Sequence, residues 1–210
     1  MNSPIDLARP ARLWLGLPLF VALVAILATG CTAVQKAEFR PGSKHVNKHP
    51  IRVALVLDKP LCKLEQHRDP EGYVYPLGAY LCPCIRHIAH EAFTGDTEYD
   101  SLEAAHRAQD VDAILLPEFV KLEIRARGVA WEKRHALAVM QWTLKDIKSQ
   151  KTIWLATVEG RAEGRVGSGF TMDKKDRKAF QEALDDLYAK SLDAFNTSEE
   201  IKAFADGLRR

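Results

Sequence analysis

The chain has 210 residues, of which 30 are lysine or arginine and 28 are aspartate or glutamate, so that its net charge is only +2. This balance argues against a nucleic-acid-binding protein, because such proteins concentrate positive charge on one face. Hydrophobic residues make up 47% of the chain and charged residues 28%, which is typical of a globular domain.

The first thirty residues follow the three-part pattern of an export signal. Arg9 and Arg12 supply the positive start, and Leu13–Leu27 is an uncharged apolar run of 15 residues. This run is shorter than the roughly 20 residues that a helix needs to cross the hydrocarbon core of a bilayer. Small residues follow at positions 28–30, directly before a cysteine.

Residues 27–31 (LATGC) resemble the lipobox that lipoprotein signal peptidase cleaves before its cysteine, with Ala28 where that family usually has leucine. The resemblance implies a signal peptide over residues 1–30 and a lipid anchor, with palmitate among its acyl chains, on Cys31. Thr32 after the cysteine implies sorting to the outer membrane. The alternative is an ordinary signal peptide or membrane anchor with a chance cysteine.

Residues 31–50 are expected to form a lipidated tether, because they show little apolar periodicity and contain Pro41, Gly42 and Pro50. Their positive charges would be solvated or would rest on anionic headgroups. We expect the remaining residues, 51–210, to form a single periplasmic domain, since about 160 residues suffice for one hydrophobic core.

The domain begins with a predicted buried strand at 51–57 (IRVALVL), a run rich in β-branched residues. An irregular stretch follows, with a turn at 69–72 and a short strand at 73–75. Apolar residues at helical spacing predict a helix over Pro83–Phe93, since proline suits a first helical turn. A minor helix is expected at 101–108.

Three alternating segments then predict an antiparallel meander: strands at 111–126, 131–147 and 152–162, each with one apolar face. The residues expected on the apolar faces are Val120, Leu122, Ile124, Ala136, Ala138, Met140, Trp142, Leu144, Trp154, Ala156 and Val158. Trp131 is expected in the core as well.

Glycines at 164, 167 and 169 predict a loop, which lacks the Gly-Lys-Ser/Thr of a phosphate-binding loop. Asp173 then caps a long helix that ends near Phe195, and residues 197–200 (TSEE) form a capping box for a last short helix. The core-facing residues expected on the long helix are Phe180, Ala183, Leu184, Leu187 and Leu192. The order β-α-β-β-β-α predicts an α+β fold, with a mixed or antiparallel sheet of about four strands and helices packed on one face.

With the phrases VDAILLPEF, WTLKDIKSQKTIWLATVEG and ALDDLYAKSLDAF, residues 51–204 resemble a group of small exported domains. This group comprises the TolB amino-terminal domain, CsgG, LpoB, PelC and the YajG-type lipoproteins. The resemblance implies a domain that binds protein partners or assembles into rings in the cell envelope, without catalysis.

Besides Cys31 the chain has Cys62, Cys82 and Cys84, an odd number for an oxidising compartment. A disulfide from Cys62 to either of the other two would close the irregular loop between them, and the sequence leaves the choice open. A Cys82–Cys84 bond would be strained.

The same region contains the residue types that bind zinc. Cys82, Cys84, His87 and His90 form the candidate metal site, with Cys62 and His67 upstream. Their spacing is not that of a recognised zinc motif. For a thiol-redox role, the low-pKa motif has two residues between its cysteines, whereas Cys82 and Cys84 are separated by one.

No nucleophile with an activating base is visible, and Asp185 and Asp186 are expected on a solvated surface. We therefore expect a non-enzymatic, cofactor-free lipoprotein of the outer membrane that faces the periplasm. Its partners would be proteins of an envelope assembly, secretion or cell-wall complex, or further copies of itself, and not nucleic acid. The alternative is a periplasmic metal-binding or thiol-redox lipoprotein that uses the cysteine and histidine cluster.

Overall fold

The computed structural model describes residues 33–34, 37–42, 47–68, 73–126, 134–164 and 172–209. Several predictions therefore lie outside the described residues: the signal peptide, the lipidated Cys31, the turn at 69–72, Trp131 and the loop at 165–171. The side chains of His67 and Asp173 are not described either.

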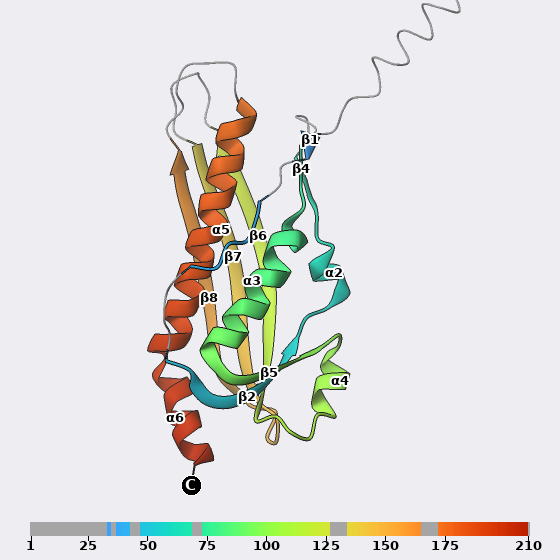
Figure 1. The fold of residues 1–210 in the computed structure, drawn as a ribbon, viewed down its shortest axis with the longest axis vertical. Coiled ribbons are helices and arrows are strands. Elements are labelled where there is room, and N and C mark those ends of the chain that lie inside the picture. The colour runs from blue at the N-terminus through green and yellow to red at the C-terminus, as the bar shows by residue number, and fades with distance from the viewer. Residues whose placement is uncertain are drawn as a thin grey trace, which may run out of the picture.

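A mixed five-stranded sheet with the order β5-β2-β6-β7-β8 forms the body of the protein (Figure 1). Its strands are β5 (Phe93–Tyr99), β2 (His49–Val56), β6 (Ala113–Ala126), β7 (Arg134–Asp146) and β8 (Thr152–Gly164). Strand β2 is parallel to both of its neighbours, because a helical connection precedes each of them. Strands β6, β7 and β8 form the predicted antiparallel meander, in which Trp142 lies opposite Pro117 and Ala156.

Three helices cover one face of this sheet, as expected: α3 (Leu77–Ala92), α5 (Met172–Thr197) and α6 (Glu199–Leu208). Two short helices complete the fold, α2 (Lys59–Cys62) and α4 (Leu102–His106). Helix α4 packs against the opposite face, where Ala105 contacts the cluster of Ala54 and Ile114. The prediction that helices lie on one face thus holds for the three long helices but not for α4.

A second, small sheet has the order β1-β4-β3. Its strands are β1 (Ala33–Val34), β4 (Tyr73–Tyr75) and β3 (Gln66–Arg68). The strand expected at 73–75 is therefore present, but it pairs with segments outside the main sheet.

Strand β5 was not predicted, and its sequence explains why. In FTGDTEY only Phe93 is buried, and there is no apolar alternation to indicate a strand. The segment is extended because its backbone pairs with β2 along the sheet edge, from Phe93 opposite His49 to Tyr99 opposite Val56. An edge strand that contributes one buried side chain is invisible to a periodicity argument.

The predicted start of the first long helix at Pro83 was wrong. Helix α3 begins at Leu77, and Pro83 lies inside it. Because proline has no backbone N–H, the helix loses the hydrogen bond to the exposed Ala79. The buried side chains of Leu77, Tyr80 and Leu81 extend the apolar face upstream and outweigh that loss.

The prediction that Val120 lies on the apolar face of its strand was also wrong. The register of β6 shifts between Phe119 and Lys121, so that Val120 is the additional residue of a β-bulge and is 49% exposed. After the bulge the alternation resumes, with Leu122 buried opposite Ala138.

The core lies between the sheet and helices α3, α5 and α6, and the apolar stripe predicted for α5 is buried there. Trp142 packs edge-on against Phe195, and its indole N–H donates to Ser191 Oγ at 3.1 Å. The last helix begins at the predicted capping box, where Ser198 Oγ accepts from the backbone N–H of Ile201. Gly160 is required for the contact of β8 with α5, because a Cβ atom there would lie 2.1 Å from the carbonyl oxygen of Ala183.

Candidate functional site

The structure joins Cys62 to Cys82 in a disulfide, with 5.4 Å between their Cα atoms. Both cysteines belong to helices: Cys62 ends α2, and Cys82 is buried in the middle of α3. The bond therefore connects the two helices and closes the loop that contains β3 and β4. Of the two pairings that the sequence left open, this one leaves Cys84 as a free thiol.

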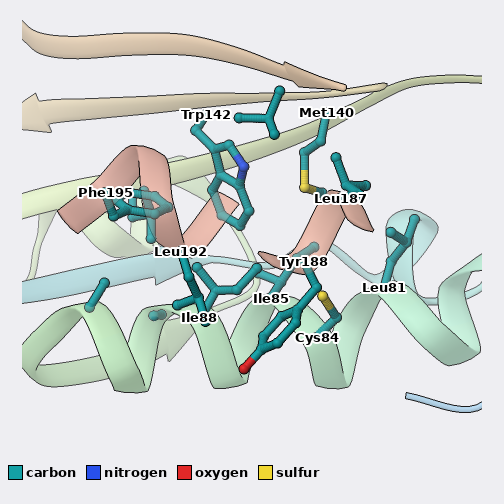
Figure 2. Close-up of a cluster of buried hydrophobic side chains, with 14 of the residues drawn as sticks. Leu81, Cys84, Ile85, Ile88, Met140, Trp142, Leu187, Tyr188, Leu192 and Phe195 are labelled. Carbon is teal, nitrogen blue, oxygen red and sulfur yellow. The ribbon is translucent and has the colours of Figure 1, made fainter. Parts of the chain in front are cut away.

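Cys84 points into the hydrophobic core, where its sulfur lies beside Ile85 and Tyr188 (Figure 2). Burial raises the pKa of this thiol far above its ordinary value, and the nearby carboxylate of Asp185 raises it further. Since the thiolate is the reactive form of cysteine, these surroundings favour a structural thiol over a redox-active one.

The cysteine and histidine residues considered for a metal do not converge. Cys82 is engaged in the disulfide, and the ring of His87 packs between Phe39 and Tyr188. His90 lies one turn further along α3, where its Nδ1 is 3.3 Å from Asp96 Oδ1. Within the described residues, no three histidine, cysteine or acidic side chains are grouped closely enough to hold a metal ion.

The same face of α3 instead receives the chain's own amino-terminal segment, which was predicted to be part of the tether. Figure 1 shows residues 37–42 on the helical side of the sheet, running from α3 toward α5. Phe39 contacts three rings, with centroid distances of 5.6 Å to Tyr80, 5.6 Å to His87 and 5.2 Å to Tyr188. Phe39 is an isolated aromatic residue in a polar segment, and this is the only signal that the sequence offered.

A polar network on α5 supports this contact. Gln181 uses both atoms of its side-chain amide on the backbone of Glu38: Oε1 accepts from the N–H at 2.9 Å, and Nε2 donates to the carbonyl at 3.0 Å. Asp185 accepts from Gln181 Nε2 at 2.8 Å and from the hydroxyl of Tyr80 at 2.7 Å. Asp185, which was predicted to be merely solvated, therefore links the two helices.

Asp186, its neighbour, has a different partner. Its carboxylate accepts from the backbone N–H of Arg161 at 2.8 Å and from Lys190 Nζ at 2.7 Å, and Lys190 also donates to the carbonyl of Glu159. These groups satisfy backbone atoms on the outer edge of β8. Helix α5 thus shields this edge from pairing with another strand.

Strand β6, in contrast, extends beyond the end of its neighbour β2. Strand β2 pairs with it only up to Leu115, although β6 continues to Ala126. Beside the residues that follow Leu115 there is a groove of about 320 Å³. The groove is lined by Val56, Asp58, Pro60, Leu61, Leu64, Leu116, Pro117, Glu118 and Phe119. It is a mainly apolar groove with two carboxylates.

The face of the meander opposite α5 also carries exposed apolar surface. Leu155 on β8 is 58% exposed. Further along β8, a concavity of about 510 Å³ is lined by charged side chains of both signs, among them Lys121, Glu123 and Arg161. In the part of the chain that the structure describes, no helix has the length and apolarity to cross a bilayer.

No protein-family model matches the chain, and no curated protein matches its sequence. Solved structures do match its fold. A Xanthomonas campestris protein of the DUF330 family has a TM-score of 0.50 at 10% identity, over 84% of this chain and 96% of that one.

Two further structures have lower scores. A homologue of the neuraminyllactose-binding hemagglutinin from Helicobacter pylori has a TM-score of 0.44 at 12% identity, over 81% of this chain and 98% of that one. The PelC dodecamer from Paraburkholderia phytofirmans has a TM-score of 0.35 at 17% identity, over 70% and 96%. PelC belongs to the group that the sequence resembles, but scores below 0.5 carry no argument about function. The likeness to the Xanthomonas protein shows the α+β fold alone.

Proposed function

We propose that this protein is a lipid-anchored accessory protein of the cell envelope, which binds partner proteins and catalyses no reaction itself. Its place would be the periplasmic side of the outer membrane, held by the lipid on Cys31. The lipobox resemblance supports the anchor, and the group resemblance supports protein binding in an assembly, secretion or cell-wall complex.

The groove beside β6 is the observation that carries the binding proposal. Beyond Leu115, β2 no longer pairs with β6. Until Leu122, whose carbonyl accepts from Gln66 Nε2, this stretch of strand edge is suited to pairing with an extended segment of a partner. The groove floor offers apolar side chains for that segment, and the exposed Val120 follows directly after it.

Photo-crosslinking in cells tests partner binding. A photoreactive amino acid at Glu118 in the groove, or at Leu155 on the open face of the sheet, should form adducts with envelope proteins. The matched control is Glu199 on α6, whose side chain is 83% exposed and distant from the groove in the fold. More adducts from Glu118 than from Glu199 support the proposal. Adducts that are equally rare at all three positions, with uncrosslinked monomer as the major product, contradict it.

Metabolic labelling tests the anchor separately. The full chain expressed in a Gram-negative host should incorporate labelled palmitate and fractionate with the outer membrane. A Cys31→Ala variant should lose the label and its processing by lipoprotein signal peptidase. Palmitate-free protein in the soluble periplasmic fraction would contradict the anchor without bearing on the groove.

A further inference from the structure

Residues 37–42 lie against the seam between α3 and α5 in the manner of a bound peptide. The two hydrogen bonds from the Gln181 amide reach the backbone N–H and C=O of Glu38, so they do not depend on which side chain stands there. The Glu38 carboxylate itself is 75% exposed and pairs with Arg40, which is 83% exposed. Such a surface ion pair contributes little, so the backbone, the buried Ala37 and Phe39 hold the segment.

The receiving side is organised by contacts within the domain. Tyr80 is fully buried, and its hydroxyl donates to Asp185, which in turn holds the Nε2 group of Gln181. The rings of Tyr80, His87 and Tyr188 stand on two helices that the core already fixes. A site whose donors and rings are held in place before binding loses little conformational freedom when it is occupied.

We propose that this seam is a binding site for an extended peptide with an aromatic side chain, and that its ligand is the chain's own segment 37–42. The segment lies between Cys31, the proposed lipid anchor, and the domain, and it follows β1, which pairs with β4. Release of the segment together with β1 would therefore set how far the domain reaches from the membrane. This second part rests on the proposed anchor at Cys31.

The change in reach follows from chain length. With the segment bound and β1 paired with β4, the chain from Cys31 to Ala33 advances by two residues, which span at most about 7 Å when extended. With β1 and the segment both released, the chain from Cys31 to the start of β2 at His49 advances by eighteen residues, which span up to about 60 Å. The bound state therefore holds the domain close to the membrane, and the released state allows a much longer tether.

Hydrogen exchange on the full-length mature protein tests the binding site and does not depend on lipid. The Glu38 amide should be protected in the wild type, and this protection should fall on the order of tenfold in Gln181→Ala, which removes two hydrogen bonds. Phe39→Ala, which leaves the helices intact, should have the same effect. The matched control is Lys178→Ala, which removes only an exposed ion pair with Glu182 on the same helix.

In all variants the α5 amides should stay protected, which shows that the domain remains folded. A Glu38 amide that exchanges freely in the wild type, or that stays as protected as in the wild type in both Gln181→Ala and Phe39→Ala, overturns the binding site.

Energy transfer tests the reach. The lipidated protein in vesicles, labelled at Glu199→Cys, should transfer less energy to a headgroup dye when Phe39→Ala is combined with Ala33→Pro and Val34→Pro, which disrupt the pairing of β1 with β4. Unchanged transfer in this variant, once hydrogen exchange has shown that its segment is released, overturns the link between occupancy and reach. Failure of the protein to bind vesicles at all contradicts the anchor, while the hydrogen-exchange result still decides the binding site.

Discussion

The disulfide between Cys62 and Cys82 should make a large contribution to stability, because it joins two residues that are 20 positions apart. Closing a loop of this length in the unfolded chain removes an entropy of roughly 11 cal/mol/K, or about 3 kcal/mol at 25 °C. Typical domains are stable by about 5–15 kcal/mol, so this is a substantial fraction. The folded geometry remains supported without the bond, since the N–H of Gly78 in α3 donates to the carbonyl of Leu64 at 2.9 Å.

Urea unfolding of the Cys62→Ala/Cys82→Ala variant measures this contribution. We expect its free energy of unfolding to lie about 3 kcal/mol below that of the oxidised wild type. Reductant should lower the wild type to the same level and leave the variant unchanged. Cys84→Ala serves as the control, because it retains the disulfide.

Two results would refute this reasoning. One is a double variant that unfolds within about 0.5 kcal/mol of the oxidised wild type, a difference typical of ordinary surface substitutions. The other is peptide mapping that pairs Cys62 with Cys84. A thiol count with metal analysis adds a further distinction: bound zinc together with three reduced thiols would support the metal-binding alternative over the accessory function.

Three other predictions concern packing and pH. Gly160→Ala should cost about 3 kcal/mol, because its Cβ would overlap the α5 backbone. Gly207→Ala, which meets no atom within 4 Å, should stabilise by up to about 1 kcal/mol, and urea unfolding that ranks the two variants otherwise contradicts the packing. Ser191→Ala should cost about 1–3 kcal/mol, measured by thermal unfolding, because the buried indole N–H of Trp142 loses its acceptor; an unchanged Tm would count against that bond. Burial raises the pKa of the Cys84 thiol. Above a pH of about 8.5 the unfolded chain therefore releases a proton that the folded state retains. The free energy of unfolding should fall by about 1.4 kcal/mol per pH unit from there to pH 10. This loss should be absent in Cys84→Ala, and equal slopes in the two proteins would show that the thiol is not buried.

The candidate site was only partly predictable. The sequence pointed to the cysteine and histidine region of α3, and that region is indeed where the disulfide and the amino-terminal segment meet the domain. It did not predict the role of Gln181 or Asp185, because their partners are 143 and 105 residues away in the chain. Nothing local marks a glutamine whose function is to bind the backbone of a distant segment.

Local patterns determined the elements whose residues alternate or repeat with a clear period: the strand at 51–57, the three strands of the meander and the long helix α5. Each has a face that must be buried, and the periodic spacing of its apolar residues along the segment indicates that face. The predicted export signal likewise rests on the sequence alone, since charge, apolar length and small residues follow one another in order.

Tertiary structure decided the features that depend on a neighbour supplied from elsewhere. Strand β5 is extended only because β2 offers a backbone edge, and Val120 turns outward only because β7 sets the register. The pairing of Cys62 with Cys82 rather than Cys84 follows from which side of α3 faces α2. In each case the determining contact is between residues remote in the chain, so no local pattern encodes it.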